Sequence, residues 1–161
     1  MTTTVFQNAR LICPETGSDA PGSLTIEGGQ IAAVNAEAPE GATVIDCNGA
    51  CLAPGIVDWG VKIGEPGERH KESFRSAGLA AAAGGVTTIT ARPDTAPAID
   101  TPETLEFVTR RAAESVVRIR HMAALTKARA GREMTEIGFL LDAGAIAFSD
   151  VFHVATDTKA L

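Results

Sequence analysis

The first third of the chain alternates short apolar runs with polar and turn residues. Alternation over four to eight residues is typical of β-strands that bury one face. The pattern predicts strands over Thr3–Phe6, Leu11–Cys13, Ser23–Glu27, Gln30–Val34 and Thr43–Asp46. Gly28 and Gly29 separate the third and fourth strands, and they predict a hairpin because glycine reaches positive φ without a steric penalty. We therefore expect a small β module over residues 1–52.

From residue 53 onward, apolar strand-like runs alternate with segments of helical periodicity. The strand-like runs cover Ala53–Val61, Val86–Ala91, Val117–Leu125 and Ala145–Phe148. Apolar residues spaced three and four apart predict helices over Lys71–Ala83, Pro102–Glu114 and Arg132–Asp142. Strand–helix repetition of this kind predicts a parallel sheet with right-handed crossovers. The fold class is therefore α/β, with strand–helix units over residues 53–161.

Capping and breaking residues support the helix boundaries. Thr101 can accept hydrogen bonds from the first free amides of a helix, and Pro102 suits the first helical position because it needs no amide donor there. Gly84 and Gly85 follow the first predicted helix, and Gly144 follows the third. These signals predict that each helix ends before the next strand begins.

Composition and charge argue against several classes of protein. The chain has 161 residues, of which 45% are hydrophobic and 21% charged, as in an ordinary folded domain rather than a disordered one. Its net charge is −6, so the basic surface that binds nucleic acid or anionic membranes is not expected. The N-terminus lacks a signal-peptide pattern, and no apolar run is long enough to span a membrane. We expect a cytoplasmic protein without nucleic-acid or membrane partners.

Three cysteines, Cys13, Cys47 and Cys51, are an odd number without a Cys-x-x-Cys pair. This spacing argues against a disulfide framework and against a zinc knuckle. We expect buried structural thiols. Arg110, Arg111, Arg118 and Arg120 form a basic run that we expect to be solvated or to contact a partner.

Six collinear motifs carry a resemblance to a known family. They are Ala53–Asp58, Glu65–Gly67, Lys71–Ser73, Ala80–Thr88, Arg92–Thr95 and Gly144–Asp150. In order and spacing they resemble dihydroorotases, the cyclic-amide hydrolases of the amidohydrolase superfamily, over residues 5–158. The resemblance implies a (β/α)8 TIM barrel with a small β sandwich, and zinc-assisted attack of hydroxide on a cyclic amide in pyrimidine synthesis. It assigns residues 1–52 to the sandwich and residues 53–161 to about four strand–helix units, the first half of the barrel.

The resemblance also identifies where the chemistry should lie, at the carboxyl ends of the strands. The family's first strand ends in Asp-x-His-x-His-x-Arg, and here the same stretch runs from Asp58 to Gly64. Gly60 and Lys62 stand in place of the two zinc-binding histidines, and Gly64 stands in place of the arginine that binds the substrate carboxylate. We expect Gly60 and Lys62 to face inward together, because alternate residues of a strand share a face.

Later motifs depart from the family in the same way. Asp94 replaces a substrate-binding asparagine, and the fourth strand's Asp-Asp-Gly becomes Asp150 followed by Val151 and Phe152. His153 follows at the same end of that strand. Lys62 is either a nucleophile or, as we favour, a replacement for the charge of zinc that neutralises Asp58, Asp94 or Asp150. Asp58 could instead fix a loop through backbone hydrogen bonds.

The histidines do not form a metal site by their spacing. His70 precedes the first helix and is expected to be solvated, and His121 lies within a strand, where we expect a satisfied or partly buried side chain. No two histidines have metal-ligand spacing, so no cofactor and no zinc are expected in this chain.

Two functions follow from the resemblance. In the first, the chain is a catalytically inactive dihydroorotase-like protein with a structural or assembly role, as for the non-catalytic relatives that are partners of aspartate transcarbamoylase. In the second, it is one piece of a zinc-dependent dihydroorotase that another polypeptide completes. Both require a complementary barrel segment or self-association, because a partial barrel leaves strand edges and one sheet face open.

Overall fold

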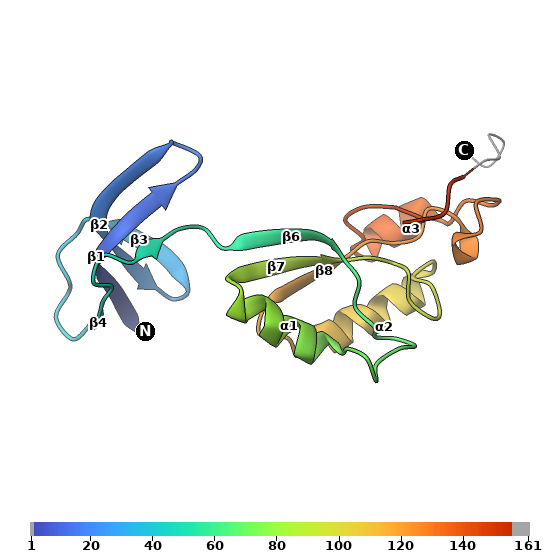
Figure 1. Cartoon of the computed structure of the whole chain (residues 1–161), viewed down its shortest axis with the longest axis horizontal. Helices are drawn as coiled ribbons and strands as arrows, with labels where there is room; N and C mark the ends of the chain where they lie inside the picture. The colour runs from blue at the N-terminus through green and yellow to red at the C-terminus, as the bar shows by residue number, and fades with distance from the viewer. Residues whose placement is uncertain (1, 156–161) are drawn as a thin grey trace. The chain divides into compact units, whose positions relative to one another are not determined.

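A computed structural model describes residues 2–155 of the chain. The chain divides into two compact units, Met1–Pro54 and Gly55–Leu161 (Figure 1). The expected boundary lies two residues earlier, after residue 52.

The first unit is one five-stranded sheet. Its strands are β1 (Thr3–Cys13), β2 (Ser18–Glu27), β3 (Gln30–Val34), β4 (Thr43–Asp46) and β5 (Cys51–Leu52). The order is β3-β2-β1-β4, and β5 pairs with β1 as well. β2 is antiparallel to β1 and to β3, whereas β4 and β5 run parallel to β1. A small β module is therefore present, and its described strands belong to a single sheet.

The predicted hairpin is confirmed, and one strand prediction is wrong. Gly28 and Gly29 have φ angles of 58° and 80°, and they connect the pair Glu27 and Gln30 across antiparallel strands. The two strands predicted over residues 3–13 form one strand, β1. Asn8 has a φ of 54° and lies where the register with β2 shifts, so the strand bends there without ending.

The cysteines are less buried than expected. Cys13 and Cys47 are half-buried, Cys51 is exposed, and all three thiols are free. The prediction of buried structural thiols is therefore wrong.

The second unit has the predicted alternation of strands and helices. Its elements are β6 (Ile56–Val61), α1 (Phe74–Ala83), β7 (Val86–Ala91), α2 (Pro102–Ala112), β8 (Arg118–His121), the short 3-10 helix η1 (Lys127–Arg129) and α3 (Ile137–Asp142). β6, β7 and β8 form a parallel sheet in that order (Figure 1). The α/β class and the parallel sheet are confirmed for these three strands.

The predicted fourth strand is reduced to a single bridge between Ala123 and Phe148. The segment still lies beside the end of β8, because Ile146 N donates to His121 O at 3.1 Å and Ala123 N donates to Ala147 O at 2.9 Å. A ladder this short has no neighbour on its other side among the described residues. The sequence pattern therefore predicted the position of this segment correctly, but the segment forms a single bridge instead of the predicted strand.

Caps determine where the helices begin. Ser73 accepts a hydrogen bond from Ser76 N, and Ser76 Oγ accepts one from Ser73 N, so α1 begins at Phe74 rather than at the predicted Lys71. Thr101 caps α2 by accepting from Thr104 N at 3.3 Å, as predicted. Each cap satisfies amides that would otherwise lack partners and is worth about 1 kcal/mol.

The core lies between one face of the parallel sheet and helices α1 and α2. Ile89 of β7 is buried there with Leu105 and Val108 of α2 and Phe74 of α1. Full burial of a leucine such as Leu105 contributes about 1.5 to 3 kcal/mol. The core therefore fixes the sheet against its helices and so sets the positions of the strand ends.

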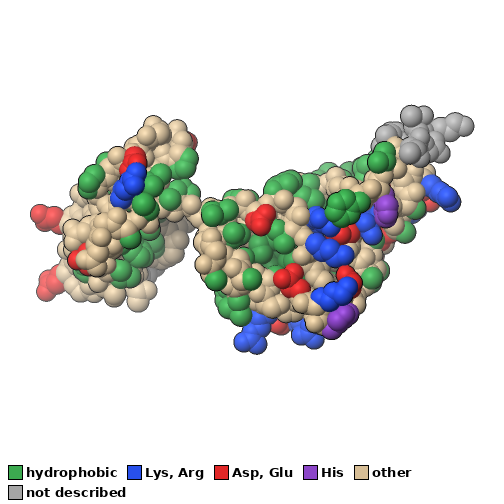
Figure 2. Space-filling model, viewed as in Figure 1, with side chains coloured by type: hydrophobic (Ala, Val, Ile, Leu, Met, Phe, Trp, Pro, Cys, Tyr) green, Lys and Arg blue, Asp and Glu red, His purple; other side chains and the backbone are tan. Residues whose placement is uncertain are grey.

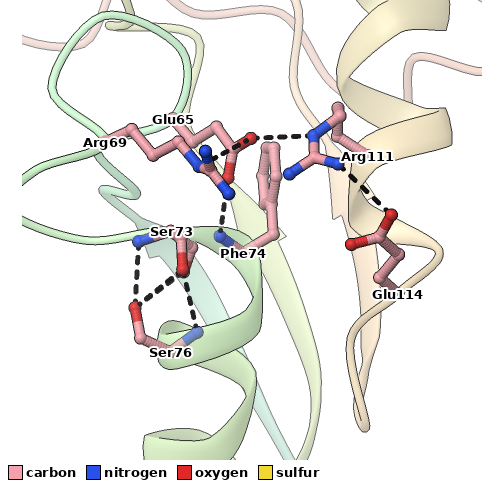
Figure 3. Close-up of polar contacts among 7 residues, drawn as sticks. All are labelled: Glu65, Arg69, Ser73, Phe74, Ser76, Arg111 and Glu114. Carbon is pink, nitrogen blue, oxygen red and sulfur yellow. Dashed lines mark hydrogen bonds and ion pairs between the residues drawn. The ribbon is translucent and has the colours of Figure 1, made fainter.

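Glu65 anchors the loop that follows β6 (Figure 3). Its buried carboxylate accepts hydrogen bonds from Phe74 N at 3.2 Å and from Arg111 Nε at 2.9 Å, and Arg69 Nε lies 3.6 Å away. Arg111 also donates to Glu114, and the hydrogen bond with Glu65 together with the negative charges of Glu65 and Glu114 raises the pKa of Arg111. Glu65 thereby ties this loop to α1 and α2, which holds the residues after β6 in place.

Candidate functional site

A cluster of charged side chains lies at the carboxyl ends of β6 and β7. Lys62 follows β6, and Arg92 and Asp94 follow β7. Parallel strands bring their carboxyl ends to one edge of the sheet, so these residues meet although 30 positions separate Lys62 from Arg92. We call Lys62, Glu68, Arg92 and Asp94 the ion cluster.

Asp94 is the buried centre of the ion cluster. Its side chain is 7% exposed, and its two oxygens accept from Arg92 Nε at 3.1 Å and Arg92 Nη2 at 2.5 Å. Burial alone would raise the pKa of Asp94, but the hydrogen bonds and charge of Arg92 and the charge of Lys62 outweigh it. The pKa of Asp94 therefore lies below its ordinary value. This carboxylate is ionised and already satisfied by a bidentate partner.

Lys62 bridges two acids. Its Nζ lies 3.3 Å from Glu68 Oε2 and 3.8 Å from Asp94 Oδ2. Glu68 also pairs with Lys71, and hydrogen bonds from Lys71 and Lys62 lower the pKa of Glu68. The Lys62 side chain is 47% exposed, so solvent weakens both pairs. On the face of the second unit that Figure 2 shows, basic and acidic side chains lie next to each other.

The two glycines of this stretch are fixed by different constraints. Gly60 has a φ of 88° and lies where the register of β6 and β7 shifts, and a Cβ placed there would face Arg92 Cδ at 3.9 Å. A Cβ on Gly64 would lie 2.6 Å from the backbone oxygen of Glu68. A side chain at position 60 is thus opposed by backbone conformation, and one at position 64 is opposed by direct overlap.

Asp58 and Asp150 do not join Lys62. Asp58 pairs in register with Ile89, whose side chain faces α1 and α2, so Asp58 points to the helix side of the sheet edge and is exposed. Asp150 is buried and accepts from Leu125 N, from Thr126 N and from Thr126 Oγ1, at 3.0, 3.0 and 2.5 Å. Of the three acids expected near Lys62, only Asp94 contacts it. Asp150 instead fixes the loop after β8.

The segment after Asp150 is strained and reaches back to the ion cluster. Val151 has a φ of 61°, which is unfavourable for a β-branched residue. Phe152 stacks on the guanidinium of Arg92, 4.8 Å from the ring centroid. His153 is exposed, and its backbone N donates to Asp150 O at 3.1 Å. The structure places Phe152, rather than His153, beside the cluster.

The pattern of the sequence did not identify Arg92, Glu68 and Phe152 as site residues. Arg92 was visible only as part of the Arg92–Thr95 motif, although its spacing of two from Asp94 allows an ion pair at a strand end. Glu68 and Phe152 carry no local signal, because loops bring them to the cluster.

The sequence predicts that the side chain of His121 is hydrogen-bonded or partly buried. In the structure this side chain is buried in the core. Its ring packs edge-on against Phe74, with centroids 5.6 Å apart, and neither ring nitrogen has a hydrogen-bond partner among the described residues. Burial lowers the pKa of His121 to about 4. This side chain is neutral at pH 7, and it lies on the helix side of the sheet with Ala91, away from the ion cluster. His70 is exposed, as expected.

The residues present do not fit a zinc ion. Gly60 has no donor atom, Lys62 is a cation, and both oxygens of Asp94 are engaged by Arg92. Over residues 2–155, no group of three or more His, Cys, Asp or Glu side chains is placed to hold a metal. The chemistry of this site is therefore that of paired charges.

None of the helices within residues 2–155 has both the length and the apolar character that a membrane span requires.

Comparisons with known proteins agree on one family. The family model described as "Dihydro-orotase-like" matches residues 49–159. The chain is 39% identical over 147 residues to a dihydroorotase of Streptococcus pneumoniae, and 40% identical over 147 residues to dihydroorotases of Streptococcus pyogenes. These matches cover 91% of this chain and 35% of each relative. The chain thus spans about a third of the length of these relatives.

Solved structures give the same fold. An L-hydantoinase from Arthrobacter aurescens is similar with a TM-score of 0.78 and 25% identity, over 92% of this chain and 32% of that chain. A dihydroorotase structure is similar with a TM-score of 0.60 and 18% identity, over 92% of this chain and 42% of that chain. At such identity the second likeness concerns the fold alone.

Proposed function

The chain belongs to the dihydro-orotase-like family, and on that premise we propose that it is a cytoplasmic, dihydroorotase-like protein of pyrimidine biosynthesis that does not itself hydrolyse a cyclic amide. Its role is structural: it contributes a folded part of the family's architecture to a larger assembly. The proposal separates the family's scaffold, which the chain retains, from the family's metal chemistry, which needs ligands that this chain replaces.

The ion cluster is the observation that carries the proposal. Family resemblance puts two zinc-binding histidines at Gly60 and Lys62, and these positions now hold a glycine and a cation. Arg92 lies beside Gly60 and donates hydrogen bonds to both carboxylate oxygens of Asp94. Ion pairs within the chain therefore take the place of metal–ligand bonds. A divalent cation would have to enter beside Lys62 and Arg92 and compete for an engaged carboxylate, which charge repulsion opposes.

The finer architecture is part of the proposal. The β6-β7-β8 sheet with α1 and α2 corresponds to the beginning of a (β/α)8 barrel, with the segment around Phe148 as the start of a fourth strand. The five-stranded sheet of the first unit corresponds to part of a β sandwich. The similarity to the L-hydantoinase chain, at a TM-score of 0.78 over 92% of this chain, supports both assignments.

An activity measurement tests the proposal. The purified chain is incubated with dihydroorotate and with excess zinc at neutral pH, beside the dihydroorotase of Streptococcus pneumoniae as the positive control. We expect ring opening at the uncatalysed rate with the chain and saturable turnover with the control. Saturable, zinc-dependent turnover by the chain alone would overturn the proposal.

A second candidate is a zinc-dependent dihydroorotase of which this chain is one piece. The share of the relatives that it matches, 35%, favours this reading, because other segments could supply ligands. The two candidates differ in the metal content of the completed assembly. Stoichiometric zinc and turnover in an assembly that contains this chain would support the second candidate.

The partner expected for a non-catalytic relative is aspartate transcarbamoylase. Co-elution of the two purified proteins in size-exclusion chromatography, at micromolar concentration and physiological ionic strength, tests this expectation. Independent elution would remove aspartate transcarbamoylase as the partner and leave the non-hydrolytic role intact.

A further inference from the structure

A pocket of about 280 Å³ in the second unit shares no residue with the ion cluster. It lies between the loop after β6, the start of α1 and the end of α2 (Figure 3). Arg69 comes from the loop, Arg75 from the first turn of α1 and Arg111 from the last turn of α2. Because each of these elements contributes one arginine, we call this cavity the arginine pocket.

The buried carboxylate of Glu65 uses only part of the hydrogen-bonding capacity of these arginines. Its Oε1 accepts from Arg111 Nε at 2.9 Å and lies 3.6 Å from Arg69 Nε, and its Oε2 accepts from Phe74 N at 3.2 Å. A guanidinium carries five N–H donors. Both Nη groups of Arg69 and the Nη2 group of Arg111 have no hydrogen-bond partner among residues 2–155. Glu65 is therefore satisfied at both oxygens, and charged donors remain at the pocket.

Arg75 adds a cation that has no acidic partner within the described part of the chain. It is exposed, and it takes part in none of the ion pairs there. Its own residue lies in the first turn of a ten-residue helix, where free amides give the helix end a partial positive charge. This partial charge adds to that of the three guanidinium groups.

The arginine pocket carries a net positive charge on a chain that is acidic as a whole. Three arginines line it against two acids, Glu65 and Glu114. Glu114 is 65% exposed and pairs with Arg111 Nη1 at 3.2 Å, so solvent screens most of its charge. The net charge of the whole chain is −6, which opposes non-specific attraction of anions. An anion that binds this chain is therefore expected to bind where arginines gather.

We propose that the arginine pocket binds a phosphate dianion, either as free phosphate or as the phosphate group of a small monoester. Its oxygens accept from the free Nη groups of Arg69 and Arg111 and from the guanidinium of Arg75. A carboxylate offers two oxygens and one charge, whereas a phosphate group offers at least three oxygens and up to two charges, which suits three arginines better. The inference goes beyond the proposed function and does not depend on it.

The size of the pocket favours a small ligand. A volume of about 280 Å³ is close to the lower end of the range for ligand pockets, which begins at roughly 300 Å³. Binding also has a local consequence, because Arg69 belongs to the loop that Glu65 ties to both helices. A phosphate group held by Arg69, Arg75 and Arg111 adds a second connection among the same elements. We therefore expect the ligand to slow amide hydrogen exchange in the loop over residues 64–73.

Titration calorimetry with the full chain, at neutral pH and low ionic strength, tests the proposal. The probes are inorganic phosphate and glycerol 3-phosphate, with acetate and glycerol as controls for charge and for the carbon skeleton. The main variant is Arg69→Gln with Arg75→Gln, which removes two cations and leaves Arg111 bound to Glu65. Its matched control is the double change Arg110→Gln with Arg132→Gln.

The control changes the net charge by the same amount as the main variant. Both of its arginines are exposed, and neither lines the arginine pocket. Arg75→Gln alone serves as a second variant, because it breaks no ion pair within residues 2–155. Unchanged circular dichroism and melting of all variants would show that they fold.

We expect one phosphate group to bind per chain, with a dissociation constant in the millimolar range or below. Acetate should bind at least about tenfold more weakly, and glycerol should not bind. The Arg69/Arg75 variant should lose at least about tenfold in affinity, Arg75→Gln alone about threefold or more, and the control less than about twofold. The tighter of the two phosphate probes identifies the form of the ligand. Slower hydrogen exchange over residues 64–73 should accompany binding to the wild-type chain.

Three results would overturn the proposal. The first is the absence of saturable binding by both phosphate probes. The second is binding of acetate as tight as that of phosphate, which would show a site for a single charge. The third is an equal loss of affinity in the Arg69/Arg75 variant and in the Arg110/Arg132 control, since the attraction would then come from overall charge and not from this pocket.

Discussion

Replacing Arg92 with methionine removes the main partner of the buried Asp94 while preserving the unbranched stem that lies beside Gly60 and Phe152. The change eliminates two hydrogen bonds from the guanidinium, at 3.1 and 2.5 Å, and leaves Asp94 with Lys62 at 3.8 Å. Because the Asp94 side chain is only 7% exposed, solvent cannot readily replace these bonds. Arg92→Met therefore tests whether the ion cluster stabilises the fold.

The size of the effect follows from burial. Breaking a fully buried ion pair by removing one partner costs about 3 to 5 kcal/mol. Arg92 is 19% exposed and Lys62 remains nearby, so we expect a loss of about 2 to 3 kcal/mol in the free energy of unfolding of the second unit. Loss of the Phe152 contact is worth about 0.5 kcal/mol of this. Arg92→Met with Asp94→Asn should recover most of the loss, because no buried charge is then left unpaired.

The pH dependence has a definite sign. In the wild-type chain the pKa of Asp94 is depressed, so its contribution to stability is present above the unfolded pKa of about 3.9 and is lost as the pH falls through the folded pKa. In Arg92→Met, burial without the guanidinium should raise the pKa of Asp94 instead. The stability difference between wild type and variant is then greatest at neutral pH. It shrinks as the pH falls through the raised pKa of Asp94 in the variant and then through the depressed pKa of Asp94 in the wild type.

Hydrogen exchange of the β7 amides over Val86–Ala91, with urea denaturation followed by circular dichroism, reports the stability of the second unit. The matched control is Lys127→Met, which removes the exposed Lys127–Glu133 pair of the same unit and should cost less than about 1 kcal/mol. An Arg92→Met effect no larger than that of the control would refute the reasoning. So would an effect that stays constant down to pH 3, or no recovery with Asp94→Asn.

Three further predictions concern stability. Val151→Asn should stabilise the second unit by about 1 kcal/mol, because asparagine tolerates the positive φ of 61° better than a β-branched residue; an unchanged or lower melting temperature would contradict this. Gly64→Ala should destabilise by more than about 1 kcal/mol, since its Cβ would lie 2.6 Å from a backbone oxygen, whereas Gly138→Ala, with no atom within 4 Å, should be neutral or stabilising in the same melting experiment. Burial lowers the pKa of His121 to about 4 from about 6.5 in the unfolded chain. The unfolded chain therefore binds more protons in this range, so stability should fall by about 3 kcal/mol as the pH drops from 6.5 to 4. His121→Leu should remove that slope, and a slope that persists would show that other groups cause it.

The sequence was sufficient for elements that depend on local signals. The hairpin at Gly28 and Gly29 and the cap at Thr101 follow from backbone conformation and from the need to satisfy free amides. The parallel order of β6, β7 and β8 follows from strand–helix alternation. In each case a few neighbouring residues determine the outcome, so the pattern can be read directly.

Features that depend on distant contacts were predicted less well. The two strands predicted on either side of Asn8 are one strand that bends at this residue. The segment before Phe148 forms only a bridge, because a strand needs neighbouring strands to complete its hydrogen bonds. At the site, the pattern indicated that Lys62 would meet an acid but could not distinguish Asp94 from Asp58 and Asp150. That choice depends on which face of the sheet each residue occupies and on the loop bonds of Thr126 to Asp150.

The central claim is that side chains of this chain replace the family's metal ligands, and zinc titration of the metal-free chain tests it most directly. Cysteine thiols could bind zinc independently, so all titrations use a chain whose three cysteines are replaced by serine. Calorimetry at pH 7 then compares this chain with the same chain carrying Gly60→His and Lys62→His. The account predicts no saturable zinc binding by the chain that retains Gly60 and Lys62, and measurable binding once both histidines are present. About one tightly bound zinc per chain with Gly60 and Lys62 in place would contradict it.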